Sequence, residues 1–144
     1  MAAGNWTLVN TAVADILNGT IDLQGTIKVA LHHSGSDIST SATTWAGVSG
    51  EVAPSNGYTA GGVAVTLTAT GTTSVKLSFS SNPSWTASGG SIVAYWAVLY
   101  EVGGNVIAFC LLDNTPASVT IGSGNTLAID SDGSPNPICT FTVS

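Results

Sequence analysis

The sequence has very little charge. Asp, Glu, Lys and Arg together make up 7% of its 144 residues, whereas soluble domains average about 25%. Arginine is absent, and Lys28 and Lys76 are the only lysines. Surface polarity must therefore come from Ser, Thr, Asn and Gly. Such an exterior favours burial in an assembly; the alternative is a tight monomer with a hydroxyl-rich surface.

The shortage of cations excludes two classes of partner. The formal net charge is −6 and the isoelectric point is about 4.2. Nucleic-acid binding depends on Lys and Arg against phosphates, and two lysines cannot supply those contacts. Attachment to anionic membrane surfaces needs the same cations. We therefore expect no nucleic-acid partner and no membrane partner.

Long apolar runs are also lacking. The longest, residues 92–100, is too short to span a bilayer as a helix. The opening residues MAAGNWTLVN show no basic stretch followed by an apolar one, which predicts no secretory signal. On that expectation the glycosylation acceptor matches at Asn5 and Asn18 are chance matches. The protein is then expected to be made in a reducing cytoplasm.

Cysteine is scarce as well. Cys110 and Cys139 are the only two, and two do not form a disulfide framework in a chain of this length. Both lie in alternating apolar runs. This placement favours two buried free thiols over a bridge between them.

Hydrophobic periodicity predicts a mainly β protein with one helix at the front. Apolar residues in 8–18 recur at helical spacing, and Asn18-Gly19 is a plausible end of that helix. A polar loop covers residues 34–49. About eight strands are expected in residues 26–143, and the length suits a single domain over residues 1–144. The predicted class is an antiparallel β-sandwich or barrel.

The expected strands are of two kinds. Some alternate apolar and polar residues and so have one dry face, whereas two are apolar on both faces and are expected at the centre of a sheet. Gly103-Gly104 predicts a hairpin between those two central strands. The alternating strands are residues 26–33, 63–69 and 74–80; the central strands are 91–101 and 105–113; the short closing strands are 118–121, 126–129 and 138–143.

The stretch SNGYTAGGVAV, residues 55–65, raises the question of a phosphate-binding loop. Such a loop needs a lysine after its glycines and leads into a helix. Here no lysine follows the glycines, and the stretch leads into a strand. We therefore interpret Gly57, Gly61 and Gly62 as a structural turn with positive φ angles, anchored by a packed Tyr58.

No pattern in the sequence predicts catalysis or a metal centre. His32 and His33 are adjacent in a predicted strand, so they point to opposite faces and are expected as a strand-end surface pair. The segment 130–137, DSDGSPNP, lacks the closing glutamate of a calcium loop and is better read as a hairpin tip. No nucleophile motif is present. We expect no enzyme activity, no metal and no cofactor.

Four tryptophans could in principle form a sugar-binding platform, although core packing is the default for each of them. Trp96 lies in a central strand and is expected in the core. Trp6 precedes the helix and Trp45 lies in the polar loop. Those two are the candidates for exposure or for docking against a partner.

Four motifs follow one another in an order that resembles a family of small virion proteins of tailed bacteriophages. They are GTIDLQGTIKVALHHSG, GEVAPSNGYTAGGVAVTL, PSWTASGGSIVAYWAVLYE and VIAFCLLD. The clearest pieces are the GYTAGG turn and the AVLY run at residues 97–100, and the resemblance covers residues 8–143. The sequence departs from the pattern at Tyr95, where such proteins often have arginine, and at Asp113-Asn114-Thr115, where several have an Asp-aromatic-Gly turn.

The resemblance implies a structural role in the virion. Some proteins of this kind look like capsid decoration or cement proteins. The leading expectation is therefore a cement protein on the outer head surface, bound to the major capsid protein and assembled as a homo-oligomer, with a trimer favoured. The alternative is a tail fibre, spike or adhesion module that recognises a host glycan.

Overall fold

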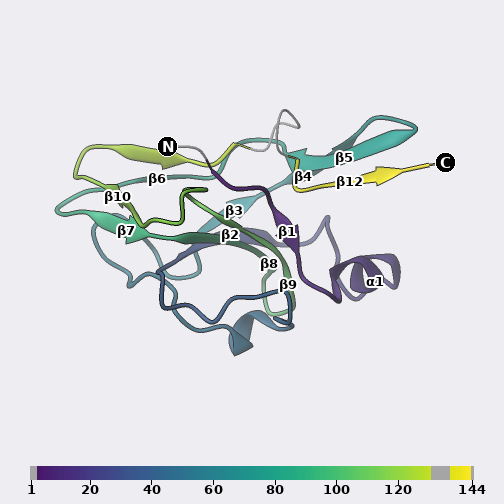
Figure 1. Ribbon diagram of the computed structural model, residues 1–144, viewed down its shortest axis with the longest axis horizontal. Coiled ribbons are helices and arrows are strands. Elements are labelled where there is room, and N and C mark those ends of the chain that lie inside the picture. The colour runs from purple at the N-terminus through teal and green to yellow at the C-terminus, as the bar shows by residue number, and fades with distance from the viewer. Residues whose placement is uncertain (1–2, 131–136, 144) are drawn as a thin grey trace.

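The computed structural model describes residues 3–130 and 137–143 as a mainly β protein (Figure 1). Strands account for 39% of it and helices for 7%. Its sheets are antiparallel, and the described residues form no closed barrel. The elements in order are β1 (Thr7–Leu8), α1 (Ala12–Leu17), β2 (Ile27–His32), η1 (Trp45–Gly47), β3 (Val63–Val65), β4 (Leu67–Thr70), β5 (Ser74–Phe79), β6 (Ser84–Thr86), β7 (Ile92–Ala94), β8 (Trp96–Glu101), β9 (Val106–Leu111), β10 (Val119–Ile121), β11 (Thr126–Ala128) and β12 (Cys139–Thr142).

A five-stranded sheet in the order β1-β9-β8-β2-β3 runs through the middle of the molecule (Figure 1). The hairpin between β8 and β9 turns at Gly103, whose φ is 74°. Both strands are buried on both faces, as their two-sided apolar pattern predicts. Strand β2 was expected to have one dry face. It is buried on both, and Val29, Ala30 and Leu31 are wholly inaccessible.

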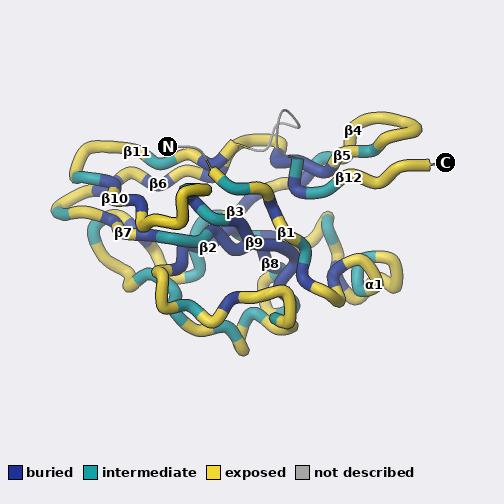
Figure 2. The backbone as a smooth tube through the Cα atoms, viewed as in Figure 1, coloured by how far each residue is buried: buried dark blue, intermediate teal, exposed yellow. Residues whose placement is uncertain are grey.

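The two faces of this sheet are covered differently. Three small sheets, β12-β5-β4, β10-β7 and β11-β6, enclose the larger apolar cluster, which includes Val29, Leu99 and Ile107 from the central sheet. Residues 34–52, here called the strap, cover the smaller cluster on the other face together with α1. That cluster consists of Val9, Ala12, Ile38, Val98, Val106 and Phe109. The strap forms the lower side of Figure 1, and Figure 2 shows the buried strands above it.

The predicted helix over residues 8–18 is shorter in the structure. Leu8 belongs to β1 and pairs with Ala108 of β9. The helix proper is α1, which is six residues long and leaves Leu17 exposed. The edge of the central sheet offers the backbone of residues 7–8 hydrogen-bond partners, and this overrides the helical periodicity. Among the described residues, no helix is both long and apolar enough to cross a bilayer.

Two predicted strands are each divided between sheets. The strand over 63–69 breaks at Thr66, so that β3 joins the central sheet and β4 joins β5. The strand over 91–101 breaks at Tyr95, where β7 leaves to pair with β10. The backbone of Tyr95 fixes this break, because its N–H donates to His32 and its carbonyl accepts from Leu112. Strand β6 was not predicted, and the described residues hold twelve strands in place of about eight.

Cys110 and Cys139 are free thiols, as expected. Cys110 is buried in the larger cluster, and burial raises the pKa of its thiol to about 12. Cys139 is only partly buried, and burial raises its thiol pKa as well. Neither thiol has the lowered pKa of a reactive cysteine.

Candidate functional site

The glycine turn at residues 56–62 crosses very close to the backbone of two strands. Gly57, Gly61 and Gly62 have φ angles of 92°, 83° and 71°. A Cβ atom on Gly62 would lie 1.9 Å from the carbonyl oxygen of Val29, and one on Gly57 would lie 2.2 Å from that of Thr86. These two positions require glycine both for conformation and for space. The turn thus fixes where β3 meets β2.

Glu51 is the centre of a hydrogen-bond network that holds this turn. The hydroxyl of Tyr58 donates to the Glu51 carboxylate at 2.7 Å, and the Gly61 N–H donates to the same oxygen. The Tyr58 hydroxyl also accepts the N–H of Leu31 at 3.1 Å. Tyr58 is 3% exposed, and its pKa is raised by burial and by its hydrogen bond to Glu51. Sequence reasoning missed Glu51, because a single glutamate in a loop carries no pattern.

Tyr100 and Trp45 extend the network to the middle of the strap. The Tyr100 hydroxyl donates to the Gly61 carbonyl at 2.8 Å, and burial raises the pKa of this tyrosine to about 12. The indole of Trp45 stacks on the Tyr100 ring with centroids 3.8 Å apart and planes 9° apart. Trp45 is therefore half-buried, and the chain itself covers one face of its ring.

His32 is wholly buried, which corrects the expectation of a surface pair. Its ring lies edge-on to Trp45 at 5.3 Å, and its Nδ1 lies 3.0 Å from the Ser36 hydroxyl and 3.3 Å from the Ser49 carbonyl. Its Nε2 is buried without a hydrogen-bond partner. His33, by contrast, is exposed. The strap folds back over the end of β2 and covers only the first of the two histidines.

Trp6, one of the two candidates for exposure or for docking against a partner, is buried by its own chain. Only 9% of it is accessible, and its ring lies edge-on to Phe79 at 5.7 Å. It belongs to the larger cluster, whereas Trp45 packs against the smaller one on the opposite face of the central sheet. The two rings therefore do not form a shared platform. Trp85 lies in the core, and Trp96 is half-buried, edge-on to Phe109.

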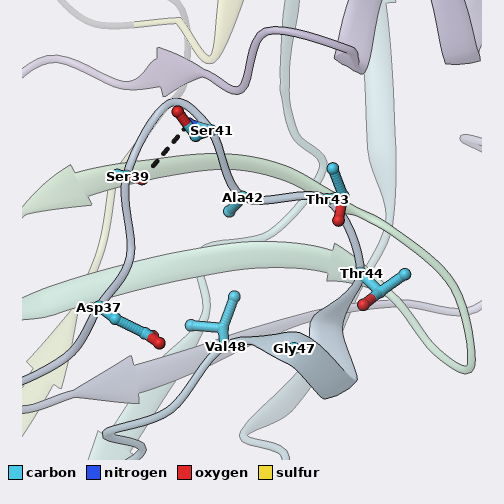
Figure 3. Close-up of a pocket in the computed structure, with 8 residues that line it drawn as sticks. All are labelled: Asp37, Ser39, Ser41, Ala42, Thr43, Thr44, Gly47 and Val48. Atoms are coloured by element: carbon cyan, nitrogen blue, oxygen red, sulfur yellow. Dashed lines mark hydrogen bonds between the residues drawn. The ribbon is translucent and has the colours of Figure 1, made fainter.

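The strap also lines a small open pocket of about 220 Å³ (Figure 3). The residues around it include two serines, two threonines and Asp37, together with the apolar Ala42 and Val48. Asp37 accepts the Ser49 N–H at 2.7 Å, and this hydrogen bond is the main cause of its lowered pKa. The lining residues are Asp37, Ser39, Ser41, Ala42, Thr43, Thr44, Gly47 and Val48. Such walls suit a small neutral polar molecule better than an anion.

The described residues contain no group of three or more His, Cys, Asp or Glu side chains that could hold a metal ion. Residues 131–136, which form most of the segment compared above with a calcium loop, lie outside the described part. Comparison of the chain with protein-family models, with curated proteins and with solved structures finds no match.

Proposed function

We propose that this protein is a structural component of a tailed-bacteriophage virion, and that it decorates and cements the outer surface of the head. The observation that carries the proposal is a charge-poor surface that leaves large apolar side chains accessible. Leu17 is 76% exposed and Val143 is 71% exposed. They lie on α1 and just after β12, two elements at the same end of the long axis in Figure 1. Exposed apolar residues of this kind suit a protein interface.

The architecture supports such a role. We infer a sandwich-like arrangement, in which the small sheets pack on one face of the central sheet and the strap covers the other. Most hydrogen bonds and aromatic contacts described above brace the fold, so the body offers a rigid scaffold. The motif order that resembles phage virion proteins points the same way. The net charge of −6 suits a protein that faces away from packaged DNA.

The proposed partner is the major capsid protein, and the protein is expected to act as a homo-oligomer, with a trimer favoured. Its mechanism is mass action. A protein that binds only the assembled lattice stabilises that lattice, and the effect grows with its concentration relative to the dissociation constant. No catalytic step is required.

Purified particles with and without this protein test the proposal. Particles that lack it are expected to lose DNA at a lower temperature and to break more readily at low salt. Quantitative mass spectrometry is expected to find hundreds of copies in each complete particle. Equal resistance of the two kinds of particle to heat and to low salt would contradict the cement role.

The pocket within the strap favours a second candidate, a tail fibre, spike or adhesion module that recognises a host glycan. Hydroxyl side chains and the Asp37 carboxylate suit the hydroxyl groups of a sugar. A handful of copies per particle would favour this candidate over the head protein. A Thr44→Val variant that loses binding on a glycan array, while an exposed Thr120→Val control retains it, would place the glycan in the pocket.

A further inference from the structure

The strap is tied to the central sheet by backbone hydrogen bonds along its length. It begins and ends beside β2, and its middle pairs with the β8–β9 hairpin and with the turn before α1. The donors are the N–H groups of Asn10, His33, Trp45, Val52 and Val106, and their acceptors are the carbonyls of Thr40, Gly50, Gly104, Leu31 and Thr43. Beneath it lie Val98, Val106 and Phe109, which are at most 8% exposed.

Inside this loop, His32 links the two arms of the strap. The Ser36 hydroxyl donates to the Ser49 carbonyl at 2.7 Å, and the Nδ1 of His32 lies within hydrogen-bond distance of both groups. Because the Ser36 proton is directed at the Ser49 carbonyl, and a carbonyl oxygen only accepts hydrogen bonds, the tautomer with the ring proton on Nδ1 is the one that satisfies both contacts. The other nitrogen, Nε2, is then the bare one. A second proton would bind to Nε2, which is buried and has no hydrogen-bond partner.

Two carboxylates and one histidine face His32 in the described structure. Glu51 and Asp37 lie on the strap and His33 follows on the chain. Both carboxylates accept hydrogen bonds from other groups. Glu51 accepts them from Tyr58 and Gly61, and Asp37 accepts one from Ser49. Their charges favour a protonated His32 only from a distance. Neither makes a hydrogen bond to Nε2 that would compensate for its proton.

We propose that His32 is an acid-sensitive latch, which as a neutral imidazole holds the strap on the sheet and, once protonated at Nε2, releases it. Release would uncover the smaller apolar cluster while the larger cluster keeps the sheets together. The latch depends only on the packing around His32, whether or not the protein belongs to a virion.

The direction of the pH dependence follows from where His32 is buried. Burial is the largest cause and lowers the pKa of His32 below its ordinary value of 6.5, although the Ser49 carbonyl and the charge of Glu51 oppose it. The released state therefore binds more protons than the closed state. Closure is fully favoured above pH 6.5 and weakens as the pH falls through 6.5 towards the lowered pKa.

Hydrogen–deuterium exchange of the whole protein at two pH values tests the latch. Between about pH 7.5 and pH 5, protection of strap amides such as Trp45 and Val52 is expected to fall about tenfold, after correction for intrinsic exchange rates. Amides between β4 and β5 serve as the internal reference and should keep their protection. In His32→Asn, whose side-chain amide can still donate towards Ser49, the tenfold fall should vanish. The matched control, His33→Asn, should behave like wild type.

Two results would overturn the latch: equal strap protection at both pH values in wild type, or the full fall persisting in His32→Asn. If His32→Asn does not fold, NMR of the wild-type protein decides instead. The His32 ring is expected to titrate below the ordinary histidine pKa of 6.5, and the strap amide shifts should follow the His32 curve. Chemical shifts of the strap amides that do not change as His32 titrates would refute the proposal.

Discussion

The two faces of the central sheet are stabilised in different ways. On one face, strands from three small sheets bury a continuous set of apolar side chains. On the other, a strap with a single short 3-10 turn lies over a few apolar residues and is held by hydrogen bonds, an aromatic stack and a buried histidine. The first face depends on apolar area removed from water, which changes little with pH. The second depends on the protonation state of one ring.

The two faces of the central sheet therefore contribute differently to the stability of the protein. The strand-covered face sets the stability of the whole fold, whereas the strap is a segment that can open locally at lower cost. The pocket and the half-buried Trp45 both belong to the strap. Features that could respond to a ligand or to acid therefore gather on the face that can change.

A substitution at Gly62, which packs against the backbone of β2, should destabilise the structure on both faces of the central sheet. Gly62→Ala would place a Cβ atom 1.9 Å from the Val29 carbonyl oxygen and 2.7 Å from the Ala30 Cα, at a φ of 71°. We expect loss of the folded state, or destabilisation of at least about 4 kcal/mol, measured by circular dichroism and thermal melting. At Gly61 the added Cβ would lie 3.1 Å from the Tyr100 hydroxyl and close to no backbone atom, so Gly61→Ala should cost less, about 1–2 kcal/mol. Gly61→Val should also destabilise the fold. Equal losses of unfolding free energy from alanine at Gly61 and at Gly62 would contradict the packing argument.

The same substitution on each face compares their packing directly. Val29 and Val98 are both wholly buried, and they face the larger and the smaller cluster respectively. Val29→Ala should cost about 2–3 kcal/mol, because the surrounding strands cannot close the cavity. Val98→Ala should cost about 1–1.5 kcal/mol, because the strap can settle into the space. Urea unfolding measures both, and equal losses would show that the strap is as rigid as the strands.

Sequence periodicity predicted much of the strand-covered face. Alternation placed β5, and the runs that are apolar on both faces placed β8 and β9. Neither pattern could show the breaks at Thr66 and Tyr95, since a strand that passes from one sheet to another keeps the same pattern of apolar residues. Leu8 was assigned to a helix because Ala108, the residue that pairs with it in the sheet, lies far along the chain.

The strap face was predicted poorly, for a physical reason. The glycine turn could be recognised because positive φ angles are a local property. The burial of His32 depends on Ser36 and Ser49, which reach it only after the strap folds back. The role of Glu51 also depends on residues that only folding brings close, because its partners Tyr58 and Gly61 lie in a separate turn. Neither residue stands in a pattern that period or spacing would reveal.

Tyr58→Phe should loosen the join between the strap and the glycine turn. The change leaves the buried Leu31 N–H without its acceptor and removes a donor from Glu51. We expect a loss of about 2 kcal/mol in unfolding free energy, with faster exchange at Gly61. Tyr95→Phe is the control, because the described structure gives its hydroxyl no protein partner, and its cost should be under about 0.5 kcal/mol. Similar losses in the two variants would argue against the network.

The smallest expected effect comes from the tryptophan of the strap. Trp45→Leu removes the stack on Tyr100 and the edge contact with His32, and it should cost about 1 kcal/mol. The loss should be confined to strap amides, because the ring is half-buried and the strap can open without unfolding the sheets. Trp6→Leu is the matched change on the other face, where the ring is 9% exposed, and it should cost about 3 kcal/mol and loosen every strand. If exchange in Trp45→Leu instead rose equally in β4, β5 and the strap, the two faces would form one cooperative unit and the latch would have no separate element to release.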